Sequence, residues 1–337
     1  MIHTRLNDAD RENQFKGYYE TMLADKNLLD NPLNELEEGK PREWQQLNTL
    51  GAMISTNDLV TKRLKPNFDV EFKGAHFHTN EFGLRDRDVK LNAGPNTLRM
   101  ALLGGSIEMG SGVETEQTFE NLVEDKLTAE QLFKPYQKVE IVNFAVPGTH
   151  LPQHLGRLDK IVPGFHPQVV IYTAHSHEIR RIRTALYRVY SDSLFLEYDY
   201  LKTFFKNLNL PAMVDEGTFT RTLRPLMIDF ITWGLGHIKH TADSIGAVPV
   251  WMFVPSLDGD YTPEEDKQLA GIAAKLGFYI LDLHDFNGNI PEEDIILRRW
   301  DRHPNAKGHA LLAKKMYEEI NKNPELVKKI KENYRLR

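Results

Sequence analysis

From residue 98 onwards, short apolar runs alternate with longer segments in which apolar residues recur at helical spacing. The apolar runs lie at 98–103, 139–144, 168–172, 248–254 and within 278–286. Between the first two runs, the apolar residues of 118–127 fall on one face of a helix. Strands separated by helices indicate a parallel sheet with helical crossovers. The pattern therefore predicts one α/β domain over residues 96–337.

The chain before residue 96 has a different pattern and predicts a helical and extended N-terminal extension over residues 1–95. Residues 1–65 read as polar helices with apolar positions at helical spacing, such as Trp44, Leu47, Leu50, Met53 and Ile54. Residues 66–97 contain short stretches with the alternation of a half-buried strand. We expect the extension to pack on the α/β domain, and a surface or dimer role is the alternative.

A long segment without a strand pattern separates the third apolar run from the fourth. Residues 180–247 read as a helical insertion rich in aromatic residues, among them Tyr187, Tyr190, Phe204 and Phe205. This insertion either forms a lid with an apolar inner wall over a site, or its aromatic residues are ordinary helix–helix core.

The first apolar run ends at paired glycines followed by Ser106, within the stretch "LRMALLGGSIEMGSG" of residues 98–112. Glycine tolerates positive φ, so the backbone can turn sharply there. A serine between a strand's carboxyl end and the expected start of a helix exposes its Oγ near backbone N–H groups that can hold an oxyanion. Ser106 is therefore a candidate nucleophile, although serine is also a common helix cap.

A candidate base and acid lie near the other end of the chain, in "DRHPNAKGH" of residues 301–309. His303 can accept a proton from a serine, and Asp301 can hold the imidazole in the required tautomer. A turn signal and a helical pattern follow, so we expect both residues on a loop at the entry of a terminal helix. A solvated Asp–His pair is the alternative, and His284–Asp285 is a rival base–acid pair.

Together these segments resemble the SGNH (GDSL-like) hydrolase family, in its bacterial type with an N-terminal extension. "LLGGSIEMGSGV" is similar to the family's nucleophile block, and "IVNFAVPGTH" of residues 141–150 to its second block, in which Gly148 provides an oxyanion-hole amide. The last block corresponds to Asp301 and His303, here spaced Asp-x-His. "TNEFGLRD" of residues 79–86 is similar to the segment before the nucleophile strand. The resemblance implies a three-layer, flavodoxin-like parallel sheet.

The third family block, Gly-x-Asn-Asp, departs most from the pattern. In an ungapped alignment, His175 replaces the glycine, His177 the oxyanion asparagine and Glu178 the aspartate. A slip of one residue places Ser176 at the asparagine instead. Either side chain can donate a hydrogen bond, so the oxyanion hole implied by the resemblance consists of the amides of Ser106 and Gly148 with His177 as the third donor.

The resemblance implies a serine esterase that hydrolyses an O-acyl, O-acetyl or lipid-like ester through an acyl-enzyme on a Ser–His–Asp catalytic triad, without metal or organic cofactor. One alternative is an O-acyltransferase that uses the same triad on a sugar or natural product. A second is a binding module with a decayed site, suggested by the departures at 175 and 177. A metalloenzyme using His175, His177 and Glu178 is a further alternative.

Composition excludes several kinds of chemistry and partner, while the resemblance implies a small-molecule or glycan ester as the substrate. The 337 residues contain no cysteine, which excludes disulfides, thiol catalysis and Cys-ligated zinc. A net charge of −6 argues against nucleic acid as the main partner, and no apolar run is long enough to span a membrane. The first residues show no secretory signal, so we expect a cytoplasmic protein, or an exported one if a signal has been trimmed. The oligomeric state stays open.

Overall fold

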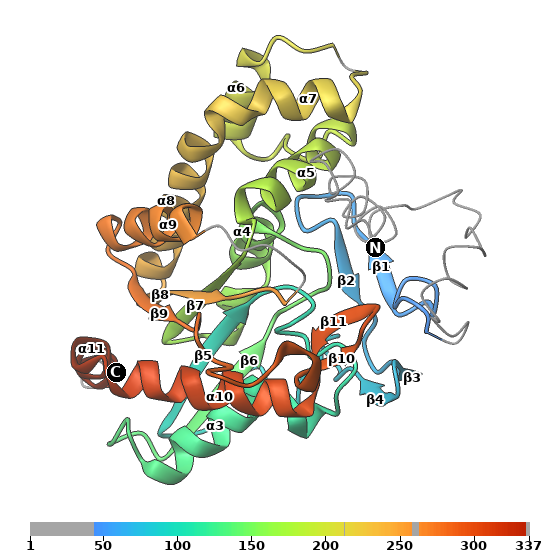
Figure 1. Ribbon diagram of the computed structural model, residues 1–337. Helices are drawn as coiled ribbons and strands as arrows, with labels where there is room; N and C mark the ends of the chain where they lie inside the picture. Colours follow the sequence, from blue (N-terminus) through green and yellow to red (C-terminus); the bar gives the residue numbers. More distant parts are fainter. Residues whose placement is uncertain (1–43, 212, 258–262, 335–337) are drawn as a thin grey trace.

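Five parallel strands form the central sheet: β5 (Thr97–Leu103), β6 (Lys138–Asn143), β7 (Val169–His175), β8 (Val248–Val254) and β9 (Tyr279–Asp282) (Figure 1). The computed structural model describes residues 44–211, 213–257 and 263–334. The strands pair in the order β6-β5-β7-β8-β9. Numbered along the chain, this order is 2-1-3-4-5, which is the flavodoxin-like arrangement. The predicted fold class is therefore confirmed.

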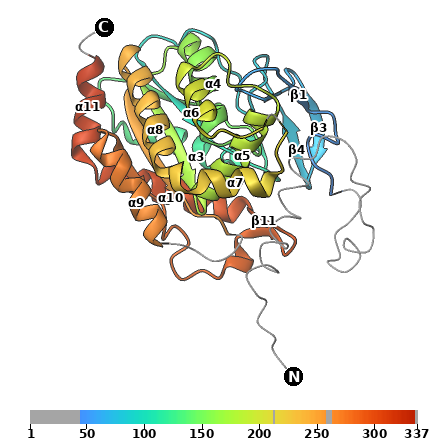
Figure 2. The ribbon, with the colours of Figure 1, turned by 90° about the horizontal axis from the view of Figure 1, so that it is seen from above.

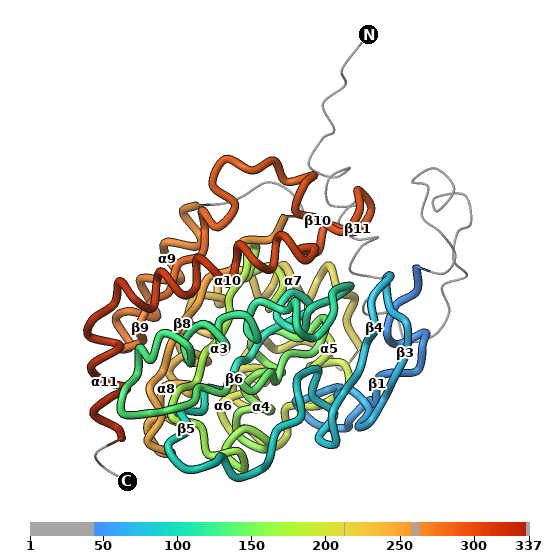
Figure 3. The backbone as a smooth tube through the Cα atoms, turned by 90° about the horizontal axis from the view of Figure 1, so that it is seen from below, coloured from blue at the N-terminus to red at the C-terminus, as the bar shows by residue number. Residues whose placement is uncertain are grey.

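Both faces of the sheet are covered because its three central strands are buried at every position. One face packs against α3 (Phe119–Glu130), α10 (Ala306–Asn321) and α11 (Pro324–Tyr334), as the view from below shows (Figure 3). The other face packs against α4 (Leu151–Lys160), α5 (Glu178–Ser191), α8 (Met227–Ser244) and α9 (Pro263–Lys275) (Figure 2). Alternate residues of β5 point to opposite layers, Met100 and Leu102 to the first and Ala101 and Leu103 to the second.

The insertion of residues 180–247 is helical, as predicted. It contains most of α5, then α6 (Asp199–Asn207), α7 (Glu216–Leu223) and α8, with the 3₁₀ turn η3 (Arg224–Leu226). Phe205, Phe219 and Phe230 are buried in the same core cluster as α4 and one face of the sheet. Tyr187, Tyr190 and Phe204 pack against that cluster. The aromatic residues are therefore helix–helix core, and the lid interpretation is wrong for them.

The described part of the N-terminal extension, residues 44–96, is called the arm below. It contains two antiparallel hairpins, β1 (Met53–Ser55) with β2 (Lys62–Leu64) and β3 (Asp69–Phe72) with β4 (Ala75–His78). The strand predicted around Val70 and Phe72 is confirmed, whereas the helix predicted across residues 44–65 is wrong. The predicted helices of residues 1–43 lie outside the described residues.

Tertiary packing explains why the helical spacing in the arm was misleading. Leu47 and Leu64 reach one small apolar cluster through turns and short strands rather than along one helix face. This cluster also buries Met109, Ala145 and Val146, which lie after β5 and β6. The arm therefore packs directly on the loops at the carboxyl edge of the sheet. This agrees with the prediction that the extension packs on the α/β domain.

Three short 3₁₀ turns and one hairpin complete the fold. The turns are η1 (Thr115–Gln117), η2 (Val162–Phe165) and η4 (Glu292–Asp294). The hairpin joins β10 (Ile296–Arg298) to β11 (Asp301–Pro304) directly before α10. Within the described ranges, no helix is both long and apolar enough to cross a bilayer.

Candidate active site

Ser106 lies just beyond the carboxyl end of β5, as predicted, and is half-buried. Consecutive turns rather than a helix follow it over residues 106–112, and α3 begins only at Phe119. The expectation that a helix starts at Ser106 is therefore wrong. The turns are held by the N–H of Ser111, which donates to the carbonyl of Ser106 over 3.1 Å. These turns hold the Ser106 Oγ at the carboxyl edge of the sheet.

Asp301 and His303 lie on strand β11 rather than on the expected loop, and both are buried. Alternate residues of a strand share a face, so the two side chains point the same way. His303 Nδ1 lies 2.5 Å from Asp301 Oδ1, and His303 Nε2 lies 2.7 Å from Ser106 Oγ. The structure thus brings together three residues that are separated by up to 197 positions in the chain.

The second carboxylate oxygen of Asp301 is also bound. Trp44 Nε1 donates to Asp301 Oδ2 over 2.8 Å, and Lys73 Nζ lies 2.5 Å from the same oxygen. Burial opposes ionisation of Asp301, but the charges and hydrogen bonds of His303 and Lys73 hold the pKa of its carboxyl far below its usual range. Asp301 is therefore ionised at neutral pH.

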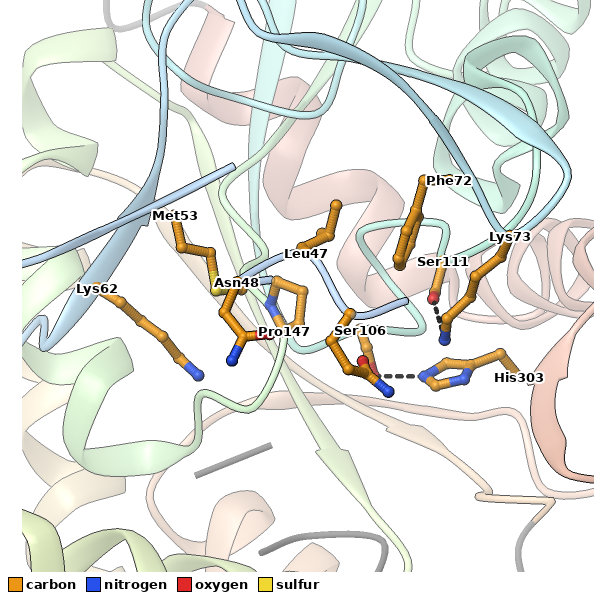
Figure 4. Close-up of a pocket in the computed structure, with 11 residues that line it drawn as sticks. Leu47, Asn48, Met53, Lys62, Phe72, Lys73, Ser106, Ser111, Pro147 and His303 are labelled. Carbon is orange, nitrogen blue, oxygen red and sulfur yellow. Dashed lines mark hydrogen bonds between the residues drawn. The ribbon is translucent and has the colours of Figure 1, made fainter. Parts of the chain in front are cut away.

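A small cavity opens at Ser106 and His303 and has a volume of about 30 Å³ (Figure 4). This is room for roughly two water molecules. Most of its lining belongs to the arm, namely Gln46, Leu47, Asn48, Met53, Lys62, Phe72 and Lys73. Pro147 and a second serine, Ser111, complete the wall. The arm, and not the helical insertion, therefore shapes the space in front of Ser106.

A buried ion pair supports the turn that carries Ser106. Glu108 Oε2 accepts the N–H of Gly105 over 2.7 Å and lies 3.2 Å from His175 Nε2. His175 Nδ1 lies 3.1 Å from the carbonyl oxygen of Val254. Burial alone would lower the pKa of His175, but the Glu108 carboxylate outweighs burial and raises it. His175, which stands at the family glycine, is thus bound beneath the nucleophile turn.

The other oxyanion candidates follow two neighbouring strands. Gly148 lies in the loop after β6 with φ of +62°, next to Pro147 of the cavity wall. His177 is half-buried and is the N-cap residue of α5, with φ of 59°. Ser176 is buried, and its hydroxyl accepts the N–H of Ser256 over 3.2 Å. The oxyanion role of His177 stays a prediction.

The rival residues are engaged elsewhere. His284 Nδ1 lies 3.1 Å from Asp282 Oδ1, and Asp285 forms an ion pair with Lys315, so each member of the rival pair has another partner. In the described ranges, no three His, Cys, Asp or Glu side chains converge as a metal ion would need. This finding does not support the metalloenzyme alternative built on His175, His177 and Glu178.

Lys73, Trp44 and Glu108 were not identified from the sequence. Lys73 and Trp44 lie far from Asp301 in the chain, and no local motif marks a contact across more than 200 residues. Glu108 lies within the nucleophile block, and its i+3 spacing from Gly105 is the one signal that could have indicated it.

No protein-family model matches the sequence, and no curated protein matches it either. Solved structures with a similar fold include a psychrotrophic esterase from Pseudoalteromonas sp., at 17% identity, 67% coverage of this chain, 98% of that chain and a TM-score of 0.43. An acetylxylan esterase from Geobacillus stearothermophilus has 15% identity, coverages of 66% and 94%, and a TM-score of 0.43.

A lipase/acylhydrolase from Enterococcus faecalis has 16% identity, coverages of 67% and 96%, and a TM-score of 0.40. At these identities the likeness says nothing about the substrate of this chain. The chain's own sheet has the flavodoxin-like strand order, with Ser106 after the first of its strands and His303 before its last helices. The fold is therefore the three-layer α/β arrangement that the SGNH (GDSL-like) resemblance implies.

Proposed function

We propose that this protein is a serine esterase of the SGNH type that hydrolyses a small-molecule or glycan ester. The observation that carries the proposal is the continuous relay from Ser106 Oγ through His303 to Asp301, with distances of 2.7 and 2.5 Å. A serine within hydrogen-bond reach of an imidazole that is oriented by a carboxylate is the arrangement of an activated nucleophile.

In the first half of the reaction, Ser106 Oγ attacks the ester carbonyl carbon while His303 Nε2 takes the hydroxyl proton. The carbonyl oxygen becomes an oxyanion, for which the amides of Ser106 and Gly148 are the proposed donors, with His177 as the third. The intermediate collapses, the ester C–O bond breaks, and His303 returns the proton to the leaving alcohol. An acyl-serine remains on Ser106.

In the second half, water attacks the acyl-serine carbonyl and gives one proton to His303 Nε2. The second tetrahedral intermediate expels Ser106, which regains its proton from the imidazolium, and the carboxylic acid is released. Asp301 stays ionised throughout and stabilises the imidazolium. The cavity of about 30 Å³ at Ser106 fits a short acyl group such as acetyl better than a long chain.

The proposal is tested by labelling with a fluorophosphonate probe, followed by peptide mass spectrometry. Two serines line the cavity, and only Ser106 contacts an imidazole; Ser111 instead lies 3.2 Å from Lys73 Nζ. We expect the label on Ser106 in the wild type and in Ser111→Ala, and none in Ser106→Ala. A label on Ser111, or none on either serine, contradicts the proposal.

A further inference from the structure

The arm supplies two donors that meet on one oxygen of Asp301. Lys73 lies in the turn between β3 and β4, and Trp44 precedes the first hairpin. Their nitrogens lie 2.5 and 2.8 Å from Asp301 Oδ2, while Oδ1 is left to His303. Figure 4 shows Lys73 beside the His303 ring, where it also reaches Ser111. Each carboxylate oxygen therefore has its own set of partners.

The two donors to Asp301 differ in charge. The side chains of Lys73 and Asp301 are only 3% and 5% exposed, so their charges attract each other with little screening by solvent. Trp44 donates a neutral hydrogen bond, and its ring is held in turn by an edge contact with Trp300 of the β10–β11 hairpin. Both donors fix the carboxylate plane, but only Lys73 changes the net charge beside His303.

The sign of the charge effect follows from the protonation of His303. A bare Asp301 anion favours the imidazolium and raises the basicity of His303, whereas a cation on the same carboxylate offsets part of that effect. Loss of the Lys73 charge should therefore favour the imidazolium form within the Asp301–His303 pair.

Other charged groups around His303 come from two further elements. His309 on α10 is fully buried, and burial lowers its pKa to about 3, so it is neutral across the working range. Glu108, in the turns after β5, is paired with His175. Arg302, the neighbour of His303 on β11, forms an ion pair with Glu292. Among the residues that the structure describes, Lys73 is the cation that forms an ion pair with Asp301.

We propose that Lys73 is a positioning residue that sets both the orientation of Asp301 and the pH at which His303 becomes a base, with Trp44 as an uncharged second clamp on the same oxygen. This inference rests on the proposed function, since it concerns the same relay. It makes the arm a functional part of the site rather than an appended extension.

The test uses the full-length chain and needs no knowledge of the substrate. The second-order rate of Ser106 modification by a fluorophosphonate is measured from pH 4 to 9 in the wild type, Lys73→Met, Lys73→Gln, Lys73→Arg and Trp44→Phe. Thermal unfolding is followed in parallel for each variant. Two neutral substitutions of Lys73 are included so that one folded variant can still be measured if the other fails to fold.

We expect the acidic limb of the rate profile to move upward by about one pH unit in the neutral Lys73 variants, as for loss of a charge near a titrating group. Lys73→Arg, which retains the charge, should keep the limb near its wild-type position. Trp44→Phe should lower the plateau rate several-fold while its limb moves much less than in the neutral Lys73 variants.

An acidic limb that stays in place in the folded neutral Lys73 variants overturns the inference, because a purely structural role would lower the plateau without moving the limb. The inference is also overturned if Trp44→Phe moves the acidic limb as far as Lys73→Met does. Failure of the wild type to be labelled at Ser106 is a different result, which contradicts the proposed function itself.

Discussion

His175 Nε2 lies 3.2 Å from Glu108 Oε2, and this buried pair sits beneath the turn that presents Ser106. Glu108 folds so tightly over the turn that a Cβ on Gly104 would come within 2.3 Å of Glu108 Cγ. Gly104 therefore allows the close approach of this carboxylate, whereas neither Gly104 nor Gly105 has the positive φ that glycine tolerates.

Glu108→Gln should destabilise the protein by on the order of 2 kcal/mol, because it leaves the buried His175 without its counter-charge. The double variant Glu108→Gln/His175→Gln, which removes both charges, should lose less than the single one. The unfolding free energy is measured in denaturant. A double variant less stable than Glu108→Gln would contradict a stabilising role for the charge pair.

The same pair has a predictable pH dependence. The folded-state pKa of His175 is raised, so its contribution is fully present below the unfolded-state value of about 6.5 and is lost as pH rises through the folded-state pKa. The stability difference between the wild type and Glu108→Gln should therefore shrink as the pH rises from 6 towards 9. A stability difference that grows between pH 6 and pH 9 would contradict a raised folded-state pKa of His175.

Gly148→Ala should lower ester turnover by at least about 10-fold, because one oxyanion amide would be displaced. At φ of +62° an alanine is strained, and its Cβ would lie 3.1 Å from Lys62 Nζ. Gly246→Ala is the matched control, since Gly246 has φ of +71° and open space around it, away from the cavity lining. An equal loss of activity in both variants would show that the effect at Gly148 comes from general backbone strain and not from loss of an oxyanion donor.

If His177 is the third oxyanion donor, His177→Ala should lower the turnover number by roughly 10²- to 10³-fold. His177→Asn, which restores the family residue, should recover much of that loss, and Ser176→Ala should be nearly silent. Steady-state kinetics on an acetyl ester provides the measurement. Full activity in His177→Ala would remove this residue from the mechanism.

Acyl preference should be set by the arm. Met53→Ala enlarges the cavity, so it should raise activity on butyryl relative to acetyl esters. Phe205→Ala, in the helical insertion, should instead cost about 3 kcal/mol of stability, as expected for a buried phenylalanine, and leave the chain-length profile unchanged. A chain-length profile that changes in Phe205→Ala but not in Met53→Ala would show that the helical insertion, and not the arm, sets the acyl preference.

The sheet was predictable because each core strand is a continuous apolar run bounded by turn residues, as Val248–Val254 shows without error. Ser106 was predictable because it follows the carboxyl end of a strand in a parallel sheet, whereas Asp301 and His303 were selected through the family resemblance. Trp44 and Lys73 were not, since their partner Asp301 is reached only through tertiary packing. For the same reason, the spacing of Leu47 and Met53 suggested a helix where turns and strands form.

We expect Ser106 and His303 to act as one catalytic unit. This expectation is tested most directly by the hydrolysis rate of 4-nitrophenyl acetate in Ser106→Ala, His303→Ala and the double variant, with folding checked by circular dichroism. Each single change should abolish most of the turnover, and the double variant should be little worse than either. Losses that multiply in the double variant, or a His303→Ala enzyme with wild-type turnover, would contradict it.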